Sequence, residues 1–148
     1  MDNREFFGGV VVPMISPFTE AGDVDAAAVA RIVERFVASG VPGIFVLGTT
    51  GEAASMPGIH KTRMVEAAAK AVAGQSRRIA LYAGISGNCL AESIDQAGQW
   101  RGAGVDAVVA HPPYYYPISD AMLEKYFEKL LTTTALPLTD AAVAIGLS

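Results

Sequence analysis

The chain has 148 residues, of which 51% are hydrophobic and 18% charged, and its formal net charge is -4. This length and composition predict a single domain with a hydrophobic core and argue against disorder. No apolar run approaches the roughly 20 residues of a membrane span, and the segment Met1–Glu5 lacks the features of a secretory signal. With no basic run to attract nucleic acid, we expect a protein that binds neither a membrane nor nucleic acid. Its single cysteine fits a reducing compartment, so we expect it to be cytoplasmic.

Five short β-like runs alternate with helix-like segments. We predict strands at Val10–Met14, Ile44–Leu47, Ile79–Tyr82, Ala107–Ala110 and Ala135–Leu138. The runs begin about 30 residues apart, the length of a strand plus a crossover helix, which favours a parallel α/β sheet. About four and a half such units make half of an eight-unit barrel, and a doubly wound open sheet is the competing architecture. Periodicity alone does not distinguish the two architectures. The lack of a G-x-G-x-x-G sequence after the first strand argues against the doubly wound sheet.

The helices between these runs are predicted from apolar periodicity and from end signals. The first helix has an apolar stripe, with Asp25 as its N-cap and Gly40 as its stop. The stripe comprises Val29, Ile32, Val33, Phe36 and Val37. The second and third helices cover about 60–73 and 91–103, and the fourth begins after Ser119.

A Gly-Thr-Thr-Gly-Glu sequence, Gly48–Glu52, follows the second predicted strand. In parallel α/β proteins, small substrates bind where strands end. Thr49 and Thr50 offer hydroxyl and amide donors that suit a carboxylate, and an ordinary βα turn is the alternative. Glu52 is either a base or, as we favour, a brace for the following turn.

A stiff aromatic segment, His111–Pro117, follows the fourth predicted strand at the same end of the sheet. A buried, hydrogen-bonded tyrosine can relay a proton, while packing at a subunit interface is the alternative. Both hold together if one tyrosine is catalytic and the others pack. We expect a structural role for His111.

The segment Ala83–Asn88 forms a third loop on this face, where Asn88 suits a turn or a cap for the next helix. Cys89 is the only cysteine, so no disulfide forms within the chain, and one cysteine with two histidines argues against structural zinc. We predict no metal and no cofactor. With no base nearby, we expect Cys89 to be a small buried residue, and Trp100 to be a packing residue.

Together these segments resemble one family, that of dihydrodipicolinate synthase and N-acetylneuraminate lyase. The opening Val12–Phe18 is similar to the family's first strand, and Leu47–Glu52 to its carboxylate-binding loop. Tyr82–Gly84 resembles its third strand, and the stretch from Gly102 to Pro117 its fourth strand and tyrosine loop. The likeness covers about residues 8 to 138.

The resemblance implies a (β/α)8 TIM-type barrel, of which residues 1–148 supply the N-terminal half as one domain. It implies a pyruvate-dependent aldolase or lyase that forms a Schiff base between a lysine and a 2-oxo acid. Gly48, Thr49 and Thr50 would then bind the substrate, and Thr50 would share a proton relay with Tyr115. In this family that tyrosine reaches a neighbouring subunit, so we expect a homodimer or homotetramer.

The chain departs from the family pattern after the fifth predicted strand. The family's Tyr-Asn-x-Pro segment and its Schiff-base lysine are missing, and residues 139–148 are predicted to be an atypical tail after an omission. The four lysines, Lys61, Lys70, Lys125 and Lys129, fall on predicted outer helices. We therefore expect the chain alone to be inactive, and a non-catalytic half-barrel that self-associates is the alternative function.

Overall fold

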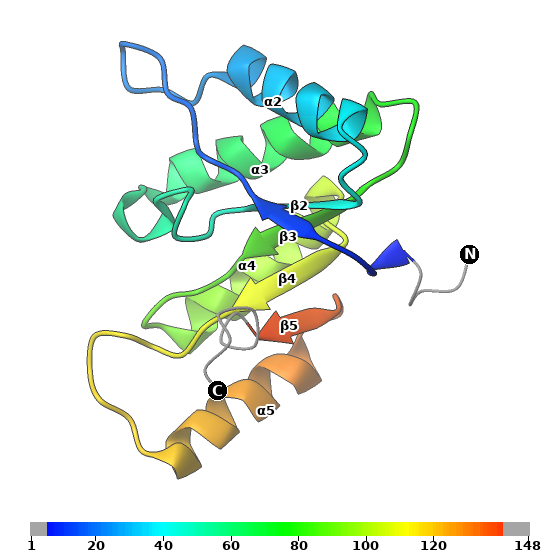
Figure 1. Ribbon diagram of the computed structural model, residues 1–148. Coiled ribbons are helices and arrows are strands. Elements are labelled where there is room, and N and C mark those ends of the chain that lie inside the picture. The colour runs from blue at the N-terminus through cyan, green and yellow to red at the C-terminus, as the bar shows by residue number, and fades with distance from the viewer. Residues whose placement is uncertain (1–5, 141–148) are drawn as a thin grey trace.

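Five parallel strands form one sheet in the computed structural model, which describes residues 6–140 (Figure 1). The strands are β1 (Val11–Pro13), β2 (Gly43–Val46), β3 (Ala80–Gly84), β4 (Ala107–Ala110) and β5 (Leu138–Asp140). They are joined by the helices α2 (Ala26–Ala38), α3 (Gly58–Ala73), α4 (Leu90–Ala103) and α5 (Asp120–Thr133), with a short 3-10 helix, η1 (Ala53–Ser55), after β2. The alternation of strand and helix predicted from the sequence is confirmed.

The order of the strands in the sheet distinguishes the two architectures that the sequence left open. Each strand pairs with the next strand along the chain, in the order β1-β2-β3-β4-β5. A doubly wound sheet reverses its strand order at a switch point, and no reversal occurs among these strands. The arrangement is therefore that of consecutive βα units of a barrel wall.

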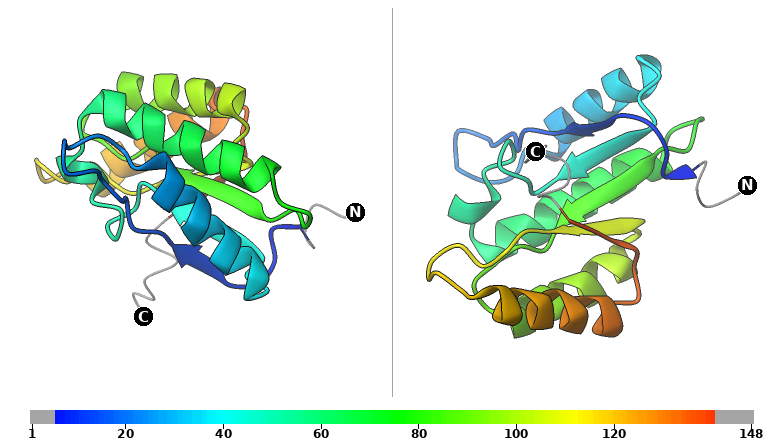
Figure 2. Two further views of the ribbon diagram at one scale, coloured as in Figure 1. Left: turned by 90° about the horizontal axis from the view of Figure 1, so that it is seen from above. Right: turned by 60° about the horizontal axis from the view of Figure 1, so that its bottom comes forward.

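The two faces of the sheet are covered differently. Side chains alternate along β3, so that Leu81 and Ala83 join the large core formed with the helices, while Ala80 and Tyr82 point to the other face. Figure 2 shows α3 and α4 on one side of the sheet. On the opposite side, Phe6 and Phe7 pack against the second cluster. The helices α2, α3, α4 and α5 thus cover one face, as in the outer layer of a barrel.

Tyr82, in the middle of β3, packs against the segment before β1. Its hydroxyl donates a long hydrogen bond of 3.4 Å to the Phe7 carbonyl, and the two rings meet edge to face. Burial, and to a smaller extent the negative charge of Asp106, raises the pKa of Tyr82 above its ordinary value. This phenol therefore serves packing and stays protonated at neutral pH.

The helix predictions are confirmed within a few residues. The Asp25 carboxylate caps α2 by accepting a hydrogen bond from the Ala28 amide at 2.9 Å, and Gly40 follows the helix with φ 81°. Among the expected packing residues, Trp100 is 2% exposed. None of the helices in the described part of the chain is long and apolar enough to cross a membrane.

Two predictions about local structure are wrong. The fifth strand begins at Leu138 rather than Ala135, because α5 runs on to Thr133 and Pro137 has no amide hydrogen for a strand ladder. Cys89 is exposed rather than buried, because it precedes α4 in an extended conformation and so stays outside the helix that packs on the sheet. Most of the predicted tail, residues 141–148, lies outside the described residues.

Candidate functional site

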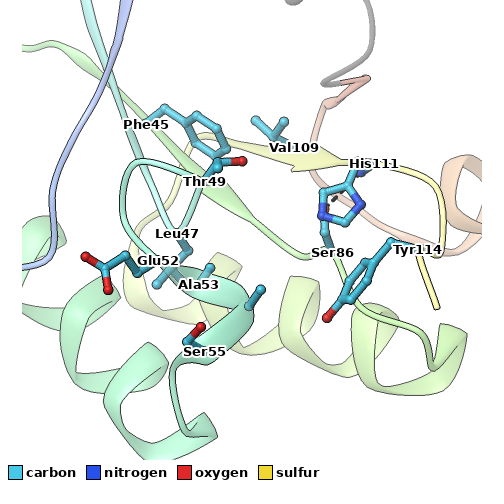
Figure 3. A pocket seen from close by; sticks show the side chains of 12 residues that line it. Phe45, Leu47, Thr49, Glu52, Ala53, Ser55, Ser86, Val109, His111 and Tyr114 are labelled. Atoms are coloured by element: carbon cyan, nitrogen blue, oxygen red, sulfur yellow. Dashed lines mark hydrogen bonds between the residues drawn. The ribbon is translucent and has the colours of Figure 1, made fainter.

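The loops that follow β2, β3 and β4 line one cavity of about 280 Å³ at the carboxyl ends of the strands. Figure 3 shows Thr49 and Ala53 on one side of this cavity and His111 and Tyr114 on the other. Phe45 and Val109 contribute apolar surface between them. The two loops, which the sequence places at the same end of the sheet, therefore meet at one cavity.

The loop after β2 is held by tight backbone contacts. Leu47 and Glu52, at its two ends, have left-handed backbone φ values of 59° and 55°. Such conformations are costly for residues other than glycine, and they persist only where the surroundings enforce them. The Ser16 hydroxyl donates to the Gly51 carbonyl at 2.8 Å, which fixes the loop from the side of β1.

Two glycines allow this close packing. A Cβ atom added to Gly48 would lie 2.6 Å from the Phe45 ring, and one added to Gly84 would lie 2.2 Å from the Leu47 carbonyl oxygen. Both distances are too short for any side chain. The loop after β2 therefore rests directly on the backbone of β3.

The predicted carboxylate-binding residues lie at the cavity to different degrees. Gly48 and Thr49 line it, whereas Thr50 is exposed on the adjoining turn and does not line it. Glu52 also lines the cavity, but its carboxylate makes no capping hydrogen bond to η1. The side-chain cap expected of Glu52 is therefore absent, and this residue is exposed on a backbone with φ 55°.

The tyrosine loop places one ring at the cavity and leaves the next two on the surface. Tyr114 lines the cavity, while Tyr115 is 70% exposed and instead meets the exposed ring of Tyr116 edge to face at 4.7 Å. Sequence reasoning did not single out Tyr114, and it expected Ser86 only as part of the substrate-adjacent loop Ala83–Asn88. The alternation of β4 contained the signal for His111, because the order 107, 109, 111 continues the face of Val109 into the cavity.

The imidazole of His111 is oriented by its own loop. Its Nδ1 atom lies 2.7 Å from the Pro112 carbonyl oxygen, which can only accept a hydrogen bond. The proton of a neutral imidazole therefore sits on Nδ1, and Nε2 is left as an acceptor. The ring also packs against Tyr114, with centroids 5.5 Å apart. His111 thus adds one polar group to a wall that also carries the hydroxyls of Ser86 and Tyr114.

Glu52 is the acidic side chain at the cavity, and the other polar groups there include backbone groups and hydroxyls. Among residues 6–140, no lysine or arginine lines it, since Lys61 and Lys70 lie on α3 and Lys125 and Lys129 on α5. In the same part of the chain, no group of three His, Cys, Asp or Glu side chains is placed to hold a metal ion. An anionic ligand would therefore rely on amide and hydroxyl donors.

Comparison with known proteins identifies the family of this chain. The sequence pattern of the Dihydrodipicolinate synthetase family matches residues 6–139. The chain belongs to this family. It is 33% identical over 129 residues to 4-hydroxy-tetrahydrodipicolinate synthase of Laribacter hongkongensis, covering 87% of the chain and 43% of that relative. It is 30% identical over 137 residues to the putative 2-dehydro-3-deoxy-D-gluconate aldolase YagE of Escherichia coli, covering 93% and 44%.

Solved structures agree with this membership of the dihydrodipicolinate synthetase family. YagE in complex with pyruvate superposes with a TM-score of 0.85 at 29% identity, over 90% of the chain and 44% of YagE. N-acetylneuraminate lyase from Mycoplasma synoviae gives 0.83 at 29% identity, over 93% and 47%. The chain spans about half the length of the relatives it matches, and its fold is half of their barrel.

Proposed function

We propose that the chain supplies the carboxylate-binding part of a pyruvate-dependent aldolase or lyase site. The observation that carries this proposal is the single cavity shared by the loops after β2 and β4. In a barrel, residues from several strand ends act together at this face. Thr49 at the cavity, beside the amides of a loop held rigidly at both ends, suits the carboxylate of a small 2-oxo acid.

The chemistry that we assign to the complete site is Schiff-base catalysis. A lysine amine attacks the ketone, water leaves, and loss of a proton from the adjacent carbon gives the enamine that makes or breaks a carbon–carbon bond. In this scheme Gly48, Thr49 and Thr50 hold the carboxylate. Thr50 and Tyr115 pass protons, with Tyr115 extending from its exposed loop toward a neighbouring subunit.

The nucleophile of this scheme is not assigned to this chain. The four lysines lie on α3 and α5, on the helical side of the sheet. We therefore expect no borohydride-trapped pyruvate adduct on the 148-residue chain by intact mass, with a full-length relative as the positive control. A stable adduct on one of these lysines would show that the nucleophile has been assigned wrongly.

The carboxylate role is tested by titrating the labelled chain with pyruvate and following backbone amide signals. Thr49→Val and Thr50→Val keep the side-chain shape and remove a hydroxyl, so each should weaken binding about five- to tenfold. Thr132→Val, on the exposed face of α5, is the matched control and should leave binding unchanged. Equal binding by all variants would remove the threonines from the site.

A second candidate function is a non-catalytic module that associates with a second copy of itself. A groove of about 680 Å³ between α5 and β5 is lined by four large apolar side chains and two carboxylates, namely Leu123, Phe127, Leu131 and Leu138 with Asp120 and Glu124. Leu131 is 61% exposed, and β5 pairs only with β4 among the described strands. An apolar groove beside an unpaired strand edge favours association.

Light scattering distinguishes a monomer from a self-associated dimer or tetramer. Self-association through this groove predicts a dimer or tetramer that dissociates when Leu131→Glu places a charge in it. Lys125→Glu, an exposed change on the same helix that leaves the groove intact, is the control. A wild-type monomer at all concentrations would exclude the module.

A further inference from the structure

The backbone of the tyrosine loop is held by side chains of the preceding βα unit. The Asn88 amide oxygen accepts hydrogen bonds from the amides of Tyr114 and Tyr115, at 2.9 and 3.0 Å. The Ser86 hydroxyl accepts one from the amide of His111, at 2.9 Å. Pro112 and Pro113 have no amide hydrogen. Every backbone donor from residue 111 to 115 is therefore bound by Ser86 or Asn88.

We propose that Asn88 is a positioning residue that fixes Tyr114 and Tyr115 at the mouth of the cavity. This assignment rests on the proposed function, in which Tyr115 passes protons. Asn88 acts on the tyrosines through their amides and touches no reacting atom. One oxygen with two lone pairs serves both donors, which sets the spacing between the two residues.

Because the tyrosine rings are exposed, the loop depends on its backbone hydrogen bonds to Asn88. Tyr114 and Tyr115 are 55% and 70% exposed, so little packing holds the rings themselves. A loop without buried anchors samples many conformations, and its order then depends on its backbone contacts. Asn88 stands just before Cys89, the N-cap residue of α4, and makes no capping hydrogen bond that the structure records. Its side chain is thus committed to the neighbouring loop rather than to its own helix.

The same residues explain why two acceptors are needed. Ser86 and Asn88 are two positions apart on the loop after β3, and they bind opposite ends of the proline pair. Ser86 fixes His111 at the inner wall of the cavity, and Asn88 fixes the tyrosines at its rim. Loss of one acceptor should therefore free one end of the loop and leave the other end in place.

Amide hydrogen exchange by NMR on the 148-residue chain tests this assignment. Asn88→Ala should speed exchange at Tyr114 and Tyr115 at least about tenfold and leave the His111 amide unchanged. Ser86→Ala should do the reverse. Asn88→Asp keeps an acceptor oxygen and should restore slow exchange to within about threefold of the wild type. Gln99→Ala, an exposed amide on α4, is the control and should change none of the three.

Further readouts separate positioning from general stability and from the proposed function. The midpoint of thermal unfolding should stay the same in Asn88→Ala, while pyruvate binding weakens about threefold or more and recovers in Asn88→Asp. Unchanged exchange at Tyr114 and Tyr115 in Asn88→Ala would overturn the assignment of Asn88, whatever pyruvate does. If the wild-type chain does not bind pyruvate, the proposed function fails, and the exchange pattern alone decides the role of Asn88.

Discussion

The two loops that meet at the cavity are held in opposite ways. The loop after β2 is fixed by its own backbone, through left-handed residues, close glycine contacts and the Ser16 hydrogen bond. The loop after β4 is fixed from outside, through side chains of the loop before it. In the first, rigidity is therefore coupled to the stability of the sheet. The order of the loop after β4 is largely independent of the stability of the sheet.

The largest effect is expected where the loop after β2 rests on β3. In Gly84→Ala the new methyl group would overlap the Leu47 carbonyl oxygen, so the backbone of the loop or strand must move. We expect a loss of about 3 kcal/mol of unfolding free energy, measured by urea denaturation. Gly102→Ala on α4 meets nothing within 4 Å and should stabilise by about 0.5 kcal/mol. Equal stabilities for the two variants would show that the contact is not tight.

A smaller effect is expected at the hydrogen bond between the loop after β2 and the segment after β1. Ser16→Ala leaves the half-buried Gly51 carbonyl without its hydroxyl donor and should cost about 1 kcal/mol. Ser39→Ala removes a similar hydroxyl-to-carbonyl bond at the exposed end of α2 and should cost less than about 0.5 kcal/mol. If the two costs are the same, the Ser16 bond does not anchor the loop.

The smallest effect is expected in the tyrosine loop. Tyr115→Phe and Tyr116→Ala alter rings that are 70% and 73% exposed, and each should change unfolding free energy by less than about 0.5 kcal/mol. Tyr126→Ala, at a ring 7% exposed on α5, should cost about 3 kcal/mol in the same assay. A large loss of unfolding free energy in Tyr116→Ala would mean that the loop after β4 supports the fold, so that its order is not independent of the sheet.

Much of the fold followed from the sequence because its signals are local. Asp25 before an apolar stripe and Gly40 after it define α2, and the spacing of the apolar runs defines the parallel sheet. The start of β5 did not follow, because the threonines at the end of α5 bond back to helix carbonyls and extend it. Cys89 was misjudged because its burial depends on how the turn before α4 packs against the rest of the chain, which the local sequence does not show.

The site was predictable at the level of loops and less so at the level of side chains. Position after a parallel strand was enough to bring the threonine and tyrosine loops to one rim. Tyr114 rather than Tyr115 lines the cavity, on a loop whose amides bind Asn88, a residue that the sequence suggested only as a turn or cap. The left-handed φ of Glu52 and its missing cap are not suggested by its residue type.

The sheet order has a consequence for how the molecule is made. Because each strand from β2 to β5 pairs with the strand before it in the chain, no pairing among these five described strands waits for a distant segment. Nascent βα units can dock in the order in which they leave the ribosome, each using the last as a template. The hydrogen bonds that hold the tyrosine loop follow the same order, since Ser86 and Asn88 are synthesised before the residues that they bind.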